Sequence, residues 1–446
     1  MGKKKAIKTQ YLVIGNSAGG IGAVEAIREV DKRNSITIVS DEPYQAYSRP
    51  LISKYLAGER KVDEMLFRPA DFYSRNGVDC LLDRKVEHLS LERRIAKLAS
   101  GEQIIWKKLL LATGGVPIVP KMKGGDKEGV FTFLTLKDAM AIDAFIEDGN
   151  QAVVIGGGLI GISVTEALMK RKTGVTVVEM KDRVLNTILD ETASSIVEEE
   201  LGQAGVRVLT NQTVAEVTGG DRVDGVVLDN GERILCDLVV IAIGVLPRTE
   251  LVSGTDIKVN RGIVVDRYMS TSYTNVYACG DAAEAYDFIY GENRLTPIWP
   301  NAHIGGRVAG YNMAGVPTEY RGGTAMNSLN YFGLDIATAG IVVPPDDGHW
   351  EVVNQRNNGA YQKIVLNDDL VKGMVFVKDI EKSGMIFSLM KDRVKVTNFR
   401  QVLLADDFGL AYLPRELWQE RLGEVPAGST SAFDILAKAE ESVSSE

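Results

Sequence analysis

The chain has 446 residues, of which 45% are hydrophobic and 25% are charged, as is typical of a soluble globular protein with two or three domains. It carries 51 Lys and Arg against 60 Asp and Glu, and the resulting net charge of −9 argues against nucleic acid as the main partner. Its three cysteines lie far apart and its three histidines accompany no cysteine cluster, so we expect neither a disulfide framework nor a bound metal.

The N-terminus and the apolar runs predict a cytoplasmic protein without a membrane span. Residues 1–10 are basic and polar, and they are not followed by the apolar stretch of a secretory signal. The longest apolar runs, near Leu109 and Leu238, are much shorter than the roughly 20 residues that a membrane-spanning helix needs.

The first predicted unit is a strand, a glycine-rich turn, a helix and a second strand. Its parts are the apolar run Tyr11–Ile14, GNSAGG at 15–20, a helix to about Glu29, and the strand Ile36–Val39, which is followed by Ser40-Asp41-Glu42. This is an imperfect copy of the dinucleotide-binding unit, with Ser17 at the middle glycine position. Serine is small enough to permit a close backbone approach. The usual ribose acid falls at Ser40, so Asp41 or Glu42 must serve instead.

The following segments combine a polar loop with short strands. The loop DEPYQAYSRPLISKYLAGE at 41–59 lies just past a strand end, where ligands bind in open α/β sheets. Arg49 and Lys54 in this loop are either solvated charges or the cationic wall of a cofactor site. We also expect short strands in 78–99, a buried strand with a glycine turn at LLLATGGVPIVP (109–120), and an amphipathic helix at 135–146.

Residues 151–179 form a second and complete copy of the unit. The strand Ala152–Ile155 leads into G-x-G-x-x-G, a helix is predicted at 162–172, and the strand 175–178 ends in Glu179. The three glycines allow a tight turn, close approach of a pyrophosphate and close helix packing. Glu179 can bind a ribose 2′-OH and would repel a 2′-phosphate. An ordinary strand–turn–helix is the alternative, but the acid favours a site for NAD(H) over NADP(H), although Lys181 and Arg183 could grip a phosphate.

The rest of the chain partly repeats this architecture and then changes. A helix at 187–202 and strands in 206–234 precede LVVIAIGVLP (238–247), which echoes LLLATGGVP and suggests a weak internal duplication. An Asp follows a strand and a glycine in YACGD (277–281), and a Gly/Ala-rich helix lies within 296–315. From about residue 321 the pattern is β. Past residue 423 we predict a flexible tail with a possible docking helix at Phe433, Ile435 and Leu436.

The motifs GNSAGG, LLLATGG, GGGLIG, IAIGVLP and YACGDAA in this order resemble the FAD-dependent pyridine nucleotide–disulfide oxidoreductases, over roughly residues 10–415. The loop at 41–59 is similar to that of NADH-dependent ferredoxin and rubredoxin reductases, of the flavin module of nitrite reductase, and of NAD reductase subunits of aldehyde and phenylglyoxylate oxidoreductase complexes. The resemblance implies an α/β fold with two Rossmann-like domains and a C-terminal α+β interface domain. The implied divisions are 1–122 with 249–322 for FAD, 123–248 for NAD, 323–420 for the C-terminal domain and 421–446 for the tail.

The resemblance also assigns residues to both cofactors. For FAD these are Gly15, Ser17, Ala18, Gly19 and Gly20 at the pyrophosphate, Asp41 or Glu42 at the adenosine ribose, Ala112, Thr113 and Gly114 along the cofactor, Asp281 at the ribitol, and Arg49, Pro50 and Lys54 around the isoalloxazine. For NAD they are Gly156, Gly158, Leu159, Ile160, Gly161, Glu179 and Gly244. Lys54 is expected nearest the reactive N5 and is the predicted catalytic residue, because a fixed ammonium there would favour the anionic reduced flavin.

Two departures from the family pattern bear on the chemistry. No cysteine lies between Ser40 and Ala57, where disulfide-reducing members carry one or two, so dithiol, coenzyme A disulfide and sulfenate peroxidase chemistry are not expected. Cys279 is interpreted as structural. Ser163 stands where relatives usually carry a Glu near the nicotinamide, and it cannot pair with Lys54.

The expected function is therefore an FAD-dependent, NAD(H)-linked oxidoreductase whose electrons pass to or from an external acceptor, such as an iron–sulfur protein or partner subunit. Two alternatives stay open: an NADH oxidase that uses oxygen, and a flavoprotein that serves as a redox-sensing or structural subunit. The resemblance also implies a homodimer or incorporation into a larger complex. The sequence leaves the acceptor and the direction of electron flow open.

Overall fold

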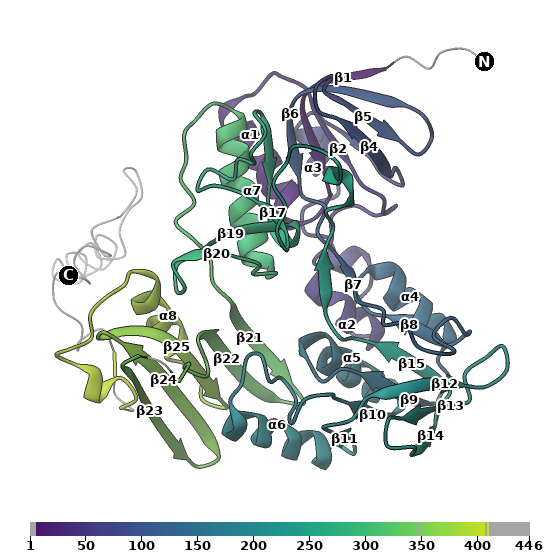
Figure 1. The fold of residues 1–446 in the computed structure, drawn as a ribbon, viewed down its shortest axis with the longest axis vertical. Helices are drawn as coiled ribbons and strands as arrows, with labels where there is room; N and C mark the ends of the chain where they lie inside the picture. The colour runs from purple at the N-terminus through teal and green to yellow at the C-terminus, as the bar shows by residue number, and fades with distance from the viewer. Residues whose placement is uncertain (1–5, 347, 406–407, 410–446) are drawn as a thin grey trace, which may run out of the picture.

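The computed structural model describes residues 6–346, 348–405 and 408–409, and Figure 1 shows them arranged in three lobes. The predicted tail at 421–446, with Phe433, Ile435 and Leu436, lies outside the described residues. Within the described ranges, no helix has both the length and the apolar character that crossing a bilayer requires.

The first lobe is built on a seven-stranded sheet with the order β3-β2-β1-β6-β5-β4, and β18, from much later in the chain, pairs with β6. Tyr11–Ile14 is buried in the sheet centre, with parallel neighbours on both sides, which explains its uninterrupted apolar sequence. Helices α1 (Ala18–Val30) and α7 (Trp299–Met313) pack closely, since a Cβ at Gly306 would lie 2.0 Å from the carbonyl oxygen of Gly19. The strands are β1 (Ile7–Ile14), β2 (Ile36–Val39), β3 (Val78–Leu81), β4 (Val86–Ser90), β5 (Ile95–Leu98), β6 (Gln103–Leu111) and β18 (Val276–Ala278).

The second lobe contains a five-stranded parallel sheet with the order β11-β10-β9-β15-β8. Its helices are α4 (Leu136–Phe145), α5 (Leu159–Lys170) and α6 (Glu191–Gln203), and a small antiparallel sheet, β12-β13-β14, lies beside it (Figure 1). The strands are β8 (Val130–Thr132), β9 (Gln151–Ile155), β10 (Gly174–Val178), β11 (Arg207–Leu209), β12 (Val214–Thr218), β13 (Gly225–Leu228), β14 (Arg233–Leu235) and β15 (Leu238–Ile241).

Short elements complete and connect these two lobes. The two segments with echoing sequences pair with each other, because β7 (Gly115–Pro117) and β16 (Val245–Pro247) form an antiparallel ribbon between the lobes (Figure 1). The remaining elements are the helices α2 (Ile52–Leu56) and α3 (Phe72–Arg75) and a small sheet of β17 (Ile263–Val264), β19 (Ala283–Asp287) and β20 (Glu292–Arg294).

The third lobe is an antiparallel sheet with the order β21-β22-β25-β24-β23 and one helix, α8 (Ser383–Lys391). Side chains such as Tyr331 and Val375 share a buried cluster with the second lobe, whereas Phe376 packs with Leu389 of α8 in another cluster. The sheet is therefore covered by α8 on one face and by the second lobe on the other. Its strands are β21 (Met326–Tyr331), β22 (Leu334–Gly340), β23 (Trp350–Asn357), β24 (Ala360–Asn367) and β25 (Leu370–Val377).

The predicted fold class of two Rossmann-like units and a C-terminal α+β unit is confirmed, but two helix boundaries were wrong. Helix α5 begins at Leu159 instead of residue 162, because Gly158 already serves as its N-cap, and it stops at Lys170 shortly before Lys172 turns to φ 59°. Helix α6 begins at Glu191 instead of residue 187, because the Asp190 side chain caps it by accepting the N–H of Ala193.

Candidate functional site

The first glycine turn is shaped so that only small residues fit. Gly15 has φ 119°, and a Cβ there would lie 2.0 Å from the carbonyl oxygen of Ala112. A Cβ at Gly20 would lie 2.0 Å from the carbonyl oxygen of Gly15. The N-cap of α1, Ser17, makes no side-chain capping bond. The first N–H groups of α1 therefore stay available to an anion such as a pyrophosphate.

The second glycine turn repeats this geometry. Gly156 has φ 106° and lies against Ala242, while a Cβ at Gly161 would lie 1.8 Å from the carbonyl oxygen of Gly156. At Gly158, in contrast, an added Cβ would meet nothing within 4 Å, and this residue caps α5 without a side-chain bond. Open space over an uncapped helix start fits a phosphate group bound near Leu159 and Ile160. Helices α4 and α6 are capped by side chains and offer no such site.

Glu179 is held rigidly at the end of β10. Only 8% of the residue is exposed, and its carboxylate accepts the N–H of Gly157 at 2.6 Å and the N–H of Lys181 at 2.8 Å. Two nearby segments add buried polar atoms that lack a partner in the described part of the chain, Nε of Arg183 and Oε1 of Gln212. An anchored carboxylate beside the glycine turn fits the ribose of NAD, as the sequence predicts.

The segments 112–114 and 244–248 meet where β6 and β15 end, beside the β7–β16 ribbon. The hydroxyl of Thr113 donates to the carbonyl of Arg248 at 2.9 Å, and the N–H of Arg248 donates to the carbonyl of Gly114 at 2.9 Å. Gly114 and Gly244 have φ 70° and 118°, which strongly favours glycine at these turns. Arg248 also forms an ion pair with Asp41 at 2.7 Å, so this predicted ribose acid has a protein partner.

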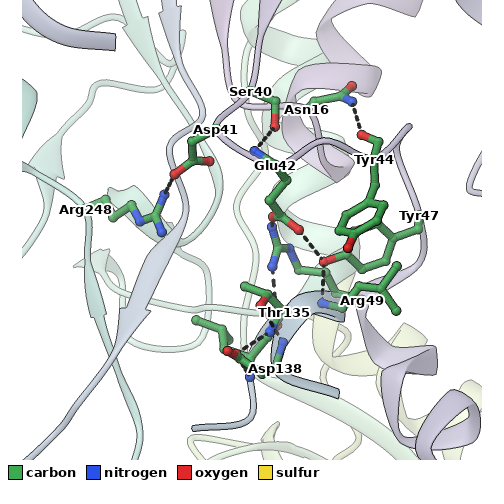
Figure 2. Close-up of polar contacts among 12 residues, drawn as sticks. Asn16, Ser40, Asp41, Glu42, Tyr44, Tyr47, Arg49, Thr135, Asp138 and Arg248 are labelled. Carbon is green, nitrogen blue, oxygen red and sulfur yellow. Dashed lines mark hydrogen bonds and ion pairs between the residues drawn. The ribbon is translucent and has the colours of Figure 1, made fainter. Parts of the chain in front are cut away.

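Figure 2 shows that Glu42, the other predicted ribose acid, is bound by two side chains of its own loop. The hydroxyl of Tyr47 donates to Oε2 of Glu42 at 2.7 Å, and Arg49 forms an ion pair with Oε1. Sequence reasoning did not anticipate this pairing and did not single out Tyr47 or Arg248. The spacing of Glu42, Tyr47 and Arg49 in one loop was the available signal.

Asp281 comes close to Arg49 from a distant part of the chain. Asp281 lies in a 3-10 turn, Gly280–Ala282, immediately after β18. Burial raises the pKa of Asp281, and the positive charge of Arg49 offsets part of that rise. Burial would lower the pKa of Arg49, but neighbouring groups that include Asp281 raise it overall. The fold therefore places these two predicted FAD residues within range of each other's charge.

Lys54, the predicted catalytic residue, lies on α2 and takes part in a chain of charges toward α5. Its Nζ is 3.1 Å from Glu59, whose other carboxylate oxygen is 2.6 Å from Lys170. Lys54 is 38% exposed, and Pro50 beside Arg49 is exposed as well. Glu59 thus pairs with Lys54, whereas Ser163 carries no charge with which to do so. Ser163 instead lies near Tyr331 of the third lobe, whose hydroxyl donates to the carbonyl of Leu159 at 3.1 Å.

The three thiols are poor nucleophiles in this structure. Burial raises the pKa of Cys80 to about 11 and those of Cys236 and Cys279 to about 12. Cys279 packs against Gly19, where an added Cβ would lie 2.7 Å from its sulfur. At neutral pH these residues are protonated, whereas disulfide exchange requires a thiolate.

Comparison with known proteins agrees with this geometry. Residues 9–307 match the family described as Pyridine nucleotide-disulphide oxidoreductase, and residues 326–394 match the Rubredoxin NAD+ reductase C-terminal domain. Subunit epsilon of the NADH-dependent phenylglyoxylate dehydrogenase of Aromatoleum evansii is 31% identical to this chain over 401 residues, which cover 89% of this chain and 95% of that protein.

Two further matches differ in how much of the other protein they cover. Nitrite reductase [NAD(P)H] of Bacillus subtilis is 30% identical over 404 residues, which are 90% of this chain but only 49% of that longer protein. A ferredoxin reductase structure from Rhodopseudomonas palustris superposes with a TM-score of 0.78 at 25% identity, covering 85% of this chain and 93% of that one. With its two glycine turns and its anchored Glu179, the chain belongs to the pyridine nucleotide–disulphide oxidoreductase family and is an FAD- and NAD(H)-dependent oxidoreductase.

Proposed function

We propose that the protein moves electrons between NADH and an external iron–sulfur protein or partner subunit, without a thiol taking part. The observation that carries this proposal is the pair of nucleotide-type turns, joined through the β7–β16 ribbon, in a chain whose three thiols, two of them buried and Cys80 partly buried, have pKa values raised well above neutral pH. FAD, when bound, supplies the redox chemistry, since a flavin can take up two electrons together and release them one at a time.

The first lobe supplies the FAD site. The uncapped start of α1, with Gly15, Ser17, Ala18, Gly19 and Gly20, binds the pyrophosphate through backbone N–H groups. Between the two candidate ribose acids we assign the role to Asp41, because Asp41 is exposed, whereas the Glu42 side chain is 18% exposed and is bonded to Tyr47 and Arg49. Asp281 and Arg49 lie on the flavin side, together with Pro50 and Lys54.

The second lobe supplies the NAD site and its preference for NADH. The start of α5 at Gly158–Ile160 binds the pyrophosphate, and Glu179 accepts the ribose hydroxyls. A 2′-phosphate would bring further negative charge to a carboxylate that is fixed by two backbone N–H groups and cannot swing away. Lys54 is linked through Glu59 to Lys170, the last residue of α5, so this chain of ion pairs joins α2 to the end of α5 that lies away from the glycine turn.

Two relatives support an external acceptor. The protein from Aromatoleum evansii is a subunit of a dehydrogenase, which favours a partner subunit, and the protein from Rhodopseudomonas palustris is a ferredoxin reductase, which favours an iron–sulfur carrier. Both have lengths close to that of this chain.

A comparison of acceptors tests this proposal. The FAD-loaded protein is given NADH together with a two-iron ferredoxin, a rubredoxin, dissolved oxygen or glutathione disulfide, each in a separate assay. We expect the fastest NADH oxidation with an iron–sulfur acceptor and none with the disulfide. Fastest turnover with oxygen would indicate an NADH oxidase, and turnover with the disulfide would overturn the proposal. Slow turnover with every acceptor would favour a sensing or structural subunit.

A further inference from the structure

Glu42 lies at the centre of a contact network that links the FAD loop to the second lobe (Figure 2). Its side chain is 18% exposed, and its two carboxylate oxygens are used separately, Oε1 by Arg49 and Oε2 by the hydroxyl of Tyr47. Tyr47 is only 5% exposed. A carboxylate whose two oxygens are held in this way is fixed in position, and it fixes its partners in turn.

The network continues to the start of α4. Arg49 donates from Nη1 to the carbonyl of Leu134 at 3.3 Å, and the N–H of Leu136 donates to the Tyr47 hydroxyl at 3.0 Å. In the capping box of α4, Asp138 accepts the N–H of Thr135 at 2.9 Å, and the N–H of Asp138 donates to Oγ1 of Thr135 at 3.2 Å. The first turn of a helix leaves N–H groups without intrahelical partners. Here its own capping box takes two of them, and Tyr47 of the other lobe takes a third.

Arg49 therefore has three kinds of neighbour at once. Its guanidinium is paired with Glu42, bonded to the carbonyl of Leu134, and its positive charge offsets part of the rise in the pKa of the Asp281 carboxyl. The planar guanidinium has several donors in a fixed geometry, so two occupied donors restrict where the remaining ones point. Glu42 and Leu134 thus determine how Arg49 is presented at the flavin site.

We propose that Glu42 is a positioning residue: together with Tyr47 it fixes the Arg49 guanidinium at the FAD site and ties it to the first turn of α4 in the second lobe. This inference rests on the proposed placement of FAD in the first lobe. Glu42 acts on FAD only through Arg49 and does not contact the adenosine ribose. The strength of FAD binding and the position of α4 against this loop consequently both depend on the Glu42 carboxylate.

A double-mutant cycle on FAD affinity tests this inference. FAD is added to the full-length apoprotein, and its dissociation constant is measured from the quenching of flavin fluorescence, for wild type, Glu42→Gln, Arg49→Gln and the double variant. We expect Glu42→Gln to weaken FAD binding about ten-fold or more, as for the loss of a hydrogen bond to a charged group. In the Arg49→Gln background the same change should have almost no further effect, because its only route to FAD is gone.

Glu25→Gln is the matched control for general destabilisation. Glu25 pairs with Arg68 in the same lobe, at exposures of 20% and 28% that resemble the 18% and 32% of Glu42 and Arg49. It should lower the melting temperature and leave FAD affinity within about two-fold. If Glu42→Gln does not fold, Tyr47→Phe replaces it in the cycle, with a several-fold loss expected only when Arg49 is present.

The possible outcomes separate this inference from the proposed function. Additive losses for Glu42 and Arg49 would mean that Glu42 reaches FAD by itself, and this would overturn the inference. An unchanged affinity in Glu42→Gln would overturn it as well. Failure of the wild-type apoprotein to bind FAD would refute the proposed FAD site, and the positioning role with it.

Discussion

Replacing Lys363 by Met should strongly destabilise the contact between the third lobe and the second lobe. Lys363 on β24 is 8% exposed, and its Nζ lies 2.7 Å from Oδ2 of Asp190, which is 13% exposed. Asp190 is also the N-cap of α6, and it accepts the hydroxyl of Tyr361 at 2.7 Å. Burial would raise the pKa of Asp190, but the hydrogen bond from Lys363 and those from its other partners lower it overall.

The size of the effect follows from what the substitution leaves behind. Breaking a buried ion pair on one side costs about 3–5 kcal/mol, because the remaining charge has lost its partner. Asp190 keeps its hydrogen bonds to Tyr361 and Ala193, so we expect a loss near the lower end, about 3 kcal/mol. The matched control is Lys378→Met, since Lys378 pairs with Glu200 of the same helix at 3.5 Å but is 42% exposed. That exposed pair should contribute about 0–1 kcal/mol.

Urea unfolding of the FAD-loaded protein, followed by circular dichroism, measures both losses. Adding Asp190→Asn to Lys363→Met should recover part of the stability, because the unpaired charge is removed. The folded-state pKa of Asp190 is lowered, so its stabilisation is present above the ordinary value of 3.8 and is lost as the pH falls through the folded value. The difference in the free energy of unfolding between wild type and Lys363→Met should therefore become smaller below pH 3.8. If Lys363→Met costs no more than Lys378→Met, the reasoning is wrong.

Three other predictions concern acid stability, cofactor choice and the thiols. Burial would raise the pKa of Glu25, but its hydrogen-bond partners lower it from 4.5 to about 2, so Glu25→Gln should cost about 3 kcal/mol at neutral pH and almost nothing once the pH is below 2, as measured by unfolding. A constant cost at every pH would contradict this. Glu179→Arg should raise KM for NADH and shift the preference toward NADPH, because the carboxylate that repels a 2′-phosphate is replaced by a cation; an unchanged NADH preference would show that the ribose acid lies elsewhere. Replacing Cys80, Cys236 and Cys279 by Ala should leave kcat with the best acceptor within a few-fold, since none is a thiolate at neutral pH; loss of turnover in a folded, FAD-loaded variant would contradict this.

The sequence predicts those parts of the site whose geometry is local. The spacing of the glycines and of Glu179 at the end of the next strand locates each turn, although Ala112 and Ala242, which crowd Gly15 and Gly156, come from distant strands. The start of α6 is likewise determined by residues that are close in sequence. Its cap, Asp190, was visible in the sequence but was not used.

Contacts between distant segments could not be predicted in this way. Glu42 was interpreted as a candidate ribose acid from its place after β2. In the structure it pairs with Arg49, which also donates to the carbonyl of Leu134 in another lobe. The similar sequences at residues 109–117 and 238–247 indicated a repeat. They did not indicate that parts of the two copies pair with each other as β7 and β16. The pairing of Lys54 with Glu59 could not be predicted either, because the position of Glu59 depends on a second ion pair, to Lys170 on α5. The catalytic role of Lys54 stays a prediction.

An anaerobic titration of the full-length, FAD-loaded protein with NADH tests the central claim most directly, because it counts the electrons that the protein accepts. The account predicts that one equivalent of NADH per FAD bleaches the flavin absorption band completely and that further NADH has no effect. Consumption of a second equivalent before the endpoint would reveal another two-electron centre, such as a disulfide. A band that does not bleach would show that NADH is not the electron donor.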